Sequence, residues 1–387
     1  PRRFAARELA SALGLLDALP VLAEPLRPRR VPSVRGTTTL EWAPYGVVLG
    51  WHAANSPVWV PTLVVASALV GGNAVVSRPS QRVRHTTGMV LDALIPDWPR
   101  DAVTVADLPG PRAEALVADP GVNAVVAHAS TATCKRHMAR IGAAYAEGIP
   151  MRVYIPEASG NDALIVLAGA DLDAAAQAAA VGGFANAGQL CMSAKRMIVD
   201  GRVWEAFIPR LRAAVDGLVV GNPDDEATDI GPLLPGPAAE LARGALEAAV
   251  AAGGRVVVGE VDHGRLIRPT IVRLDRHHLD ELDLWRTEMF APIRGIVVCD
   301  GAADALALAN NTPYGLGAAV FGGSTADREL LVGGLRAARV LVDEGPLYQD
   351  PHVVVGGVGE SGLMGARPKV EQLVWARRVH RASGDAH

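Results

Sequence analysis

Cysteine and lysine are the scarcest reactive residues in this chain of 387 residues. The three cysteines, Cys134, Cys191 and Cys299, are too few for a disulfide framework or a cysteine-rich zinc site. Lysine also occurs only three times, so arginine supplies almost all of the basic charge. The formal net charge of −4 gives no basic surplus for binding nucleic acid. We therefore predict a protein without a metal site and without a nucleic-acid partner.

Long apolar runs are also absent, although half of the residues are hydrophobic. The longest stretch, residues 58–76, is interrupted by Pro61 and by several polar and glycine residues, which predicts a buried helix, a turn and a strand rather than a membrane span. Near the amino terminus, Glu8 and Asp17 interrupt the apolar segment and argue against a signal peptide. A surface helix is predicted there from the helical spacing of Leu9, Leu13 and Leu16. We expect a cytoplasmic protein with no membrane partner.

Three well-known catalytic signatures are missing as well. The chain has no P-loop, no G-x-S-x-G elbow of serine hydrolases, and no G-x-G-x-x-G between a predicted strand and helix of its first half. His277 and His278 stand near Asp280 and Glu281, which suggests a metal site. They lack the i, i+4 spacing of a helical zinc site, so a solvated charged turn is the better interpretation.

Short apolar runs and helical stretches alternate over residues 46–156. The runs predict strands at residues 46–50, 74–76, 102–105 and 123–126. The longer stretches predict helices at residues 56–69, 83–95 and 130–147, the last with Ser130 or Thr131 as its cap. This alternation indicates an α/β fold with a parallel sheet covered on both faces, which binds ligands at the carboxyl ends of its strands.

The same alternation restarts after residue 160 and predicts a second α/β lobe. Strands are expected at residues 163–166, 197–199, 256–258, 295–298 and 340–342, and helices at residues 171–186, 203–215, 238–252, 302–309 and 326–335. From residue 370 to 382 we expect the end of a helix followed by an exposed strand. The chain is long enough for two or three domains, and two α/β lobes with a cleft between them are predicted.

One segment of the second lobe places a cysteine on a turn. Small residues end the helix before Cys191, a glycine-containing turn carries the thiol, and Lys195-Arg196 precedes a strand. A thiol on such a turn can face a cleft, and nearby positive charge favours its thiolate form, which is the nucleophile. Taken alone, the segment is still explained better by a buried, inert cysteine.

The sequence resembles the aldehyde dehydrogenase family, and the likeness extends over residues 40–380. Six motifs carry it: Ala54-Asn55-Ser56-Pro57, Pro156-Glu157-Ala158-Ser159-Gly160, Gly188-Gln189-Leu190-Cys191, Glu288-Met289-Phe290-Ala291-Pro292, Asn311-Thr312-Pro313-Tyr314-Gly315-Leu316 and Gly356-Gly357-Val358-Gly359-Glu360-Ser361-Gly362. Glu157 precedes Cys191 by 34 residues and Glu288 follows it by 97, intervals that fit the family. The resemblance implies three parts: a Rossmann-type cofactor-binding domain (1–32 and 46–158), an α/β catalytic domain (159–355) and a small region of oligomerisation strands (33–45 and 370–383).

The resemblance also implies an enzyme that oxidises a small-molecule aldehyde to a carboxylic acid with NAD or NADP. Cys191 would attack the carbonyl carbon, and the Asn55 amide and the Cys191 N–H would stabilise the oxyanion. Hydride transfer to the nicotinamide would leave a thioester on Cys191, and Glu157 would activate the water that hydrolyses it. Alone, Asn55 fits a turn residue and Glu157 a surface acid. The joint match favours catalysis.

Seven residues are implied in binding the cofactor: Arg78, Ser80, Gln81, Ser130, Thr131, Glu288 and Phe290. Glu288 is expected at the nicotinamide ribose and Phe290 near the nicotinamide. Family members usually carry Lys-Pro-Ser-Glu where this chain has Arg78-Pro79-Ser80-Gln81. Without the carboxylate the turn repels the 2′-phosphate of NADP less, and the guanidinium can bind that phosphate. We therefore predict that NADP is accepted. The alternative is that Arg78 and Arg82 form a solvated basic edge.

Departures from the family pattern leave two other functions open. Residues that replace a family glycine or tryptophan are Ala54, Ala129, Cys134, Ser159 and Ala291. Where a glycine is replaced, the backbone cannot approach a cofactor as closely, which would fit a non-catalytic scaffold. The scaffold hypothesis is opposed by three retained residues, Cys191, Asn55 and Glu157. An acylating enzyme that uses coenzyme A or a carrier thiol in place of water is opposed by Glu157, because hydrolysis needs that base.

Two segments predict self-association. Residues 37–42 and 375–381 are short and alternate apolar with charged side chains, as exposed strands do. An unpaired strand edge invites pairing with another chain. Together with the family resemblance, this predicts a homodimer or a homotetramer. Cys134 and Cys299 are expected to be structural.

Overall fold

The computed structural model describes residues 1–94, 100–259, 267–354, 356–362 and 369–382. Contacts divide the chain into two compact units. One, which we call the Cys191 unit, comprises Pro1–Arg7, Ser159–Tyr348 and Gly357–Gly365. The other, the Glu157 unit, comprises Glu8–Ala158, Gln349–Gly356 and Ala366–His387. The roles predicted for the two lobes stay predictions.

The Glu157 unit is built on a five-stranded parallel sheet in the order β5-β4-β3-β6-β7. Numbered along the chain this order is 3-2-1-4-5, the doubly wound Rossmann-type arrangement. Its strands are β3 (Val47–Trp51), β4 (Ala74–Arg78), β5 (Val103–Val105), β6 (Ala124–His128) and β7 (Val153–Glu157). Val and Ala runs form these strands because a parallel sheet is buried on both faces, and Val48 and Leu49 are fully buried.

Helices connect the strands of this sheet. They are α2 (Trp59–Val70), α3 (Arg84–Leu94), η2 (Arg100–Ala102), α4 (Gly110–Leu116) and α5 (Thr131–Ala146). The predicted cap of α5 is Ser130, whose hydroxyl accepts a hydrogen bond from Thr133 N at 3.3 Å. Helix α2 begins at Trp59 and not at residue 56, and α4 was not predicted from the sequence.

The amino-terminal helix α1 spans Arg2–Ala23 and is followed by η1 (Glu24–Leu26). The predicted surface helix is confirmed, and two of the leucines whose spacing predicted it, Leu9 and Leu13, are 42% and 47% exposed. Leu15 lies on the buried face and packs in one apolar cluster with Leu63 of α2. Among the described residues, the helical segment 2–26 is long and apolar enough to cross a membrane, a test that buried core helices and N-terminal signal sequences also pass.

The Cys191 unit contains a seven-stranded sheet in the order β10-β11-β12-β9-β8-β14-β15, parallel except for the β10–β11 pair. The strands are β8 (Asp162–Val166), β9 (Ala194–Asp200), β10 (Arg255–Val258), β11 (Thr270–Arg273), β12 (Ile293–Cys299), β14 (Gly317–Phe321) and β15 (Arg339–Val342). A two-stranded sheet pairs β13 (Tyr314–Gly315) with β16 (Val358–Gly359). Its helices are α6 (Leu172–Phe184), η3 (Ala185–Gly188), α7 (Trp204–Asp216), α8 (Ala238–Ala251), η4 (Arg276–Glu281), α9 (Asp283–Arg286), α10 (Gly301–Ala309) and α11 (Thr325–Gly334).

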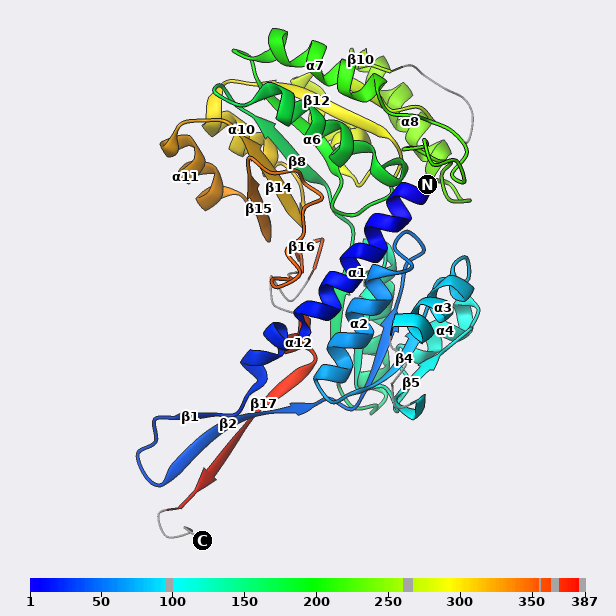
Figure 1. Cartoon of the computed structure of the whole chain (residues 1–387), viewed down its shortest axis with the longest axis vertical. Coiled ribbons are helices and arrows are strands. Elements are labelled where there is room, and N and C mark those ends of the chain that lie inside the picture. The colour runs from blue at the N-terminus through cyan, green and yellow to red at the C-terminus, as the bar shows by residue number, and fades with distance from the viewer. Residues whose placement is uncertain (95–99, 260–266, 355, 363–368, 383–387) are drawn as a thin grey trace. The chain divides into compact units, whose positions relative to one another are not determined.

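A separate three-stranded antiparallel sheet, β1-β2-β17, belongs to the Glu157 unit. Its strands are β1 (Arg29–Val31), β2 (Thr37–Pro44) and β17 (Val374–Arg381), the last preceded by the short helix α12 (Lys369–Gln372). Figure 1 shows β2 and β17 side by side, and their register runs from Val374 opposite Pro44 to Arg381 opposite Thr37. The two segments predicted as exposed strands are therefore strands, and β17 lies at an edge of this sheet.

Candidate active site

Cys191 lies on a loop whose backbone has an unusual conformation. Helix α6 ends at Phe184, and the next residues pass through three consecutive left-handed conformations: Asn186, Ala187 and Gly188 have φ values of 52°, 56° and 72°. Such a φ costs about 1–3 kcal/mol at a residue other than glycine, and it persists only where the surroundings fix it. The loop then turns at Cys191, which is partly buried, and enters β9.

Two residues outside the loop hold it in place. The fully buried guanidinium of Arg294 donates to Gly188 O at 3.3 Å and to Ser193 Oγ at 3.0 Å. Gly160 packs so closely that a Cβ there would lie 2.2 Å from Cys191 O, which only glycine avoids. The glycine retained in the glutamate motif thus has a packing reason. Arg294 was not predicted from the sequence, because its carbonyl partners are spread along the chain.

The buried Lys195 and the partly exposed Glu288 form a charge pair beside the same loop. Lys195 is fully buried, and its Nζ donates to Leu190 O at 2.6 Å and to Cys191 O at 2.5 Å. The same Nζ lies 3.7 Å from Glu288 Oε1, which also accepts a hydrogen bond from Gly160 N at 2.9 Å. Burial raises the pKa of the Cys191 thiol, and the Lys195 ammonium opposes that shift. Positive charge near the thiol, expected from the sequence, comes from Lys195.

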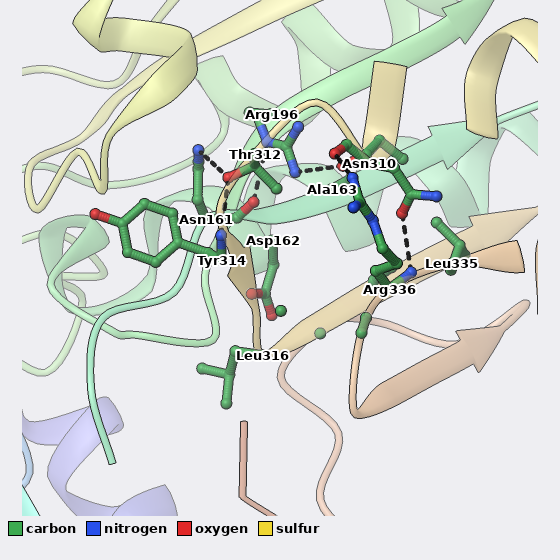
Figure 2. A pocket seen from close by; sticks show the side chains of 15 residues that line it. Asn161, Asp162, Ala163, Arg196, Asn310, Thr312, Tyr314, Leu316, Leu335 and Arg336 are labelled. Atoms are coloured by element: carbon green, nitrogen blue, oxygen red, sulfur yellow. Dashed lines mark hydrogen bonds between the residues drawn. The ribbon is translucent and has the colours of Figure 1, made fainter. Parts of the chain in front are cut away.

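Arg196, the other predicted cation, contacts different groups. Successive side chains of a strand point to opposite faces, and Arg196 donates to Asn161 O at 3.0 Å and to Ala309 O at 2.9 Å. Figure 2 shows it beside Asn161 in a small pocket that Asp162 and Thr312 also line. Burial raises the pKa of Asp162 to about 6, although Lys195 and Arg339 oppose the shift.

In the Glu157 unit, the predicted site residues follow the carboxyl ends of the parallel strands. Asn55 comes after β3, Ser80 after β4 and Ser130 after β6, and Glu157 is the last residue of β7. β3 and β6 are adjacent although they are not consecutive along the chain, and ligands bind where a strand order reverses in this way. This edge of the sheet is therefore the part of the unit where a dinucleotide is expected.

The turn that carries Asn55 is fixed by a carboxylate from α1. Glu8 Oε1 accepts hydrogen bonds from Ser56 Oγ at 2.6 Å, and from Val58 N and Trp59 N at 3.0 Å each. Val58, the N-cap of α2, offers no side-chain acceptor of its own. Glu8 therefore satisfies the free N–H groups at the start of α2, a role that its place 50 residues upstream of Val58 concealed.

Arg78 and Gln81, both on the turn predicted to select the cofactor, have different surroundings. Arg78 is 7% exposed, and its guanidinium carbon lies 4.0 Å from the centre of the Trp51 ring. Gln81 Nε2 donates to Asp107 Oδ1 at 2.8 Å, so a carboxylate does lie beside the residue that replaces the family's acid. The alternative of a solvated basic edge therefore does not describe Arg78, whereas Arg82 is exposed.

The remaining predicted residues are distributed between the units. Ser130 is exposed, Thr131 is half-buried in the first turn of α5, and Phe290 is half-buried next to Glu288. The structure thus brings Cys191 together with Glu288 in one unit, and it aligns Asn55 and Glu157 on one sheet edge in the other. Convergence of Cys191 with Asn55 and Glu157 stays a prediction.

Comparison with known proteins identifies the family of the chain. The aldehyde dehydrogenase family model matches residues 1–374. Vanillin dehydrogenase from Pseudomonas fluorescens is 32% identical over 89% of this chain and 71% of its own length. The NAD(+)-dependent benzaldehyde dehydrogenase from Pseudomonas putida is 30% identical over 83% of this chain, which spans 64% of that relative.

A solved structure adds the fold to this comparison. The NADP-dependent glyceraldehyde-3-phosphate dehydrogenase from Bacillus halodurans, complexed with NADP, superposes with a TM-score of 0.87 at 25% identity, covering 99% of this chain and 80% of that chain. The chain therefore belongs to the aldehyde dehydrogenase family, whose enzymes oxidise aldehydes with NAD or NADP.

Proposed function

We propose that this chain oxidises an aldehyde to a carboxylic acid with Cys191 as the nucleophile. The observation that carries the proposal is the strained loop at Asn186–Gly188, which Arg294 and Lys195 hold and which presents a partly buried thiol directly after it. Strain of this kind is found where a site must fix the direction of a reactive group.

The first step joins the thiol to the substrate. The Cys191 thiolate attacks the aldehyde carbon, and the carbonyl π electrons move to oxygen to give a tetrahedral thiohemiacetal anion. The Asn55 amide and the Cys191 backbone N–H donate hydrogen bonds to that oxygen. One such donor contributes about 3–4 kcal/mol of transition-state stabilisation.

The second step releases the acid. After the adduct has lost hydride, a thioester remains on Cys191, and Glu157 takes a proton from the water that attacks it. The carbon–sulfur bond then breaks, the carboxylic acid leaves, and the thiolate is regenerated. Glu157 suits this role because it carries a carboxylate, which can accept a proton, at the last position of β7, where it is half-buried.

The residues at the sheet edge of the Glu157 unit fit an anionic dinucleotide. The N-terminus of the 16-residue helix α5 and the hydroxyls of Ser130 and Thr131 offer donors for a pyrophosphate. Arg78 carries a guanidinium with a buried Nε that has no hydrogen-bond partner among the described residues. Arg78, Ser80 and Gln81 would hold the adenosine ribose, and Glu288 and Phe290 the nicotinamide end. When bound, the nicotinamide accepts the hydride that the adduct releases.

NADP acceptance is proposed from Arg78, as a cation for a 2′-phosphate. Similar proteins use either cofactor: the benzaldehyde dehydrogenase is NAD(+)-dependent, and the Bacillus halodurans enzyme binds NADP. Aromatic aldehydes are the first substrates to examine, because vanillin and benzaldehyde dehydrogenases are among the relatives. We further propose that the chain forms a homodimer or a homotetramer in the cytoplasm, and that its copies pair through the exposed edge of β17.

One assay tests this function against its alternatives. Purified protein is given a panel of aldehydes with NAD or NADP, with and without coenzyme A. Cofactor reduction that needs no coenzyme A and disappears in Cys191→Ala supports the proposal. Turnover only with coenzyme A contradicts the hydrolytic route, and failure to bind either cofactor indicates a scaffold.

A further inference from the structure

Lys195 contacts the one peptide bond whose N–H is proposed to bind the oxyanion. The Cys191 N–H belongs to the same peptide group as the Leu190 carbonyl, and that carbonyl accepts a hydrogen bond from Lys195 Nζ at 2.6 Å. Among the described residues, the Cys191 N–H donates to no backbone carbonyl. A fully buried ammonium thus binds the carbonyl end of this peptide group, whose N–H end donates to no backbone carbonyl among the described residues.

A cation at a carbonyl oxygen strengthens the N–H of the same amide. It draws electron density toward oxygen, so the nitrogen becomes more positive and its N–H a stronger donor. Hydrogen bonds polarise one another in this way, and the effect is larger where water is excluded. Lys195 is 0% exposed and sits in the interior of the Cys191 unit, where its charge is poorly screened.

Other charged groups of the unit act on this ammonium. Glu288 Oε1 lies 3.7 Å from Nζ, and Asp162 adds a second negative group, whereas Arg294 opposes both. Burial lowers the pKa of Lys195, and the two carboxylates counter that shift. Nζ also donates a hydrogen bond to Cys191 O at 2.5 Å, so it bridges the consecutive carbonyls of Leu190 and Cys191.

We propose that Lys195 is a positioning residue that polarises the Leu190–Cys191 peptide group and so strengthens the Cys191 N–H as an oxyanion donor. This inference rests on the proposed function, in which Cys191 is the nucleophile. It assigns to the cation a role at the oxyanion that is separate from its effect on the thiol.

Two reactions of Cys191 that need no cofactor distinguish the roles. Acylation by p-nitrophenyl acetate passes through a tetrahedral oxyanion: the thiolate bonds to the carbonyl carbon, and p-nitrophenolate leaves with the electron pair of the broken C–O bond. Alkylation by iodoacetamide displaces iodide at a saturated carbon and forms no oxyanion. Both rates are measured at the same pH, between 7 and 8, with peptide mass spectrometry to confirm modification of Cys191. Cys134 and Cys299 are buried and give little background.

Both reactions use the thiolate, so the ratio of their rates at one pH between 7 and 8, well below the high pH at which the ammonium itself is lost, cancels any change in the thiolate fraction. In Lys195→Met we expect this ratio of acylation to alkylation to fall by about 10-fold, less than the loss of a whole oxyanion donor. Lys195→Arg retains the charge and should restore most of the acylation rate. Lys135→Met, which removes an exposed lysine of α5, serves as the matched control. If Lys195→Met does not fold, Lys195→Gln retains an N–H donor without the charge and provides the same comparison.

Equal loss in both reactions, which leaves the ratio of their rates unchanged, or no loss at all would overturn the role at the oxyanion. Failure of the proposed function looks different. In that case, wild-type protein is acylated at residues other than Cys191, or aldehyde oxidation survives in Cys191→Ala.

Discussion

The guanidinium of Arg78 stacks on Trp51 across two adjacent strands, with its central carbon 4.0 Å from the ring centre. The two residues are register partners at the carboxyl ends of β4 and β3. Stacking on an aromatic face holds the charge while leaving the edge N–H groups of a guanidinium able to donate. The cation proposed for a 2′-phosphate is therefore placed in advance of binding.

Replacing Arg78 by alanine should raise the KM for NADP by about 10- to 100-fold, because a hydrogen bond between charged groups contributes about 1.5–3 kcal/mol. The KM for NAD should change much less, since NAD lacks the phosphate. Steady-state kinetics with both cofactors at a fixed aldehyde concentration measures the ratio. A large preference for NAD in the wild type, together with unchanged NADP use in Arg78→Ala, would refute this assignment.

Asp107 is the carboxylate that should still resist a 2′-phosphate, because it binds the Gln81 amide at 2.8 Å. Asp107→Asn removes that charge, so we expect kcat/KM with NADP to rise several-fold while the value with NAD stays within about twofold. Asp92→Asn, at an exposed acid on α3, is the control for a general change in charge. An equal gain in both variants would show that Asp107 has no specific effect.

Glu8 should be a large contributor to the stability of the Glu157 unit. Its carboxylate accepts three hydrogen bonds at the start of α2 and is 8% exposed. Glu8→Ala leaves those donors without their acceptor, and we expect the free energy of unfolding in urea to fall by about 2–4 kcal/mol. Asp17→Ala, at an exposed acid on the same helix, should change it by less than about 0.5 kcal/mol. Similar effects of the two substitutions would contradict the capping role.

The buried His52 should make the folded protein less stable in mild acid. It is 1% exposed, and burial, aided by the charge of Arg78, lowers its pKa from 6.5 to about 3. Below pH 6.5 the unfolded chain therefore binds a proton that the folded chain does not, so stability falls as pH falls toward 3. The expected decrease is about 1.4 kcal/mol per pH unit, or about 2 kcal/mol between pH 6.5 and 5.

Urea unfolding at several pH values measures this slope. His52→Gln cannot titrate in this range and should show a smaller slope, with the remainder due partly to His137, whose pKa burial lowers to about 4. An unchanged slope in His52→Gln would contradict this account, because it would mean that His52 binds its proton equally in the folded and the unfolded chain.

Local patterns predicted most strands whose apolar residues are continuous, but they missed β11, although its Thr270-Ile271-Val272 is β-branched and buried, and they missed β14. The parallel sheet of the Glu157 unit was predicted from runs such as that of β3, and the Ser130 cap from its side chain. Strand β14 was missed because Gly317-Ala318-Ala319 shows neither β-branching nor alternation, although pairing with β8 and β15 buries it fully. Tertiary pairing decided that strand.

Site residues were predicted where a motif surrounds them and missed where only the fold brings partners together. Cys191 and Glu157 stand in motifs, whereas Glu8 caps a helix that begins 51 residues later. Arg294 binds carbonyls as far away as Gly183, and no local pattern marks such an arginine. Lys195 was expected near the thiol, but its bond to Leu190 O depends on the backbone path of the loop.

The central claim, a covalent route through Cys191 completed by Glu157, is tested most directly by trapping the thioester. Glu157→Gln is incubated with an aldehyde substrate and NADP, quenched in acid, and digested for mass spectrometry. We expect one equivalent of reduced cofactor per active site, released in a burst, and the acyl mass on the peptide that contains Cys191. Steady turnover at the wild-type rate with no adduct, or an adduct on another residue, would contradict the account.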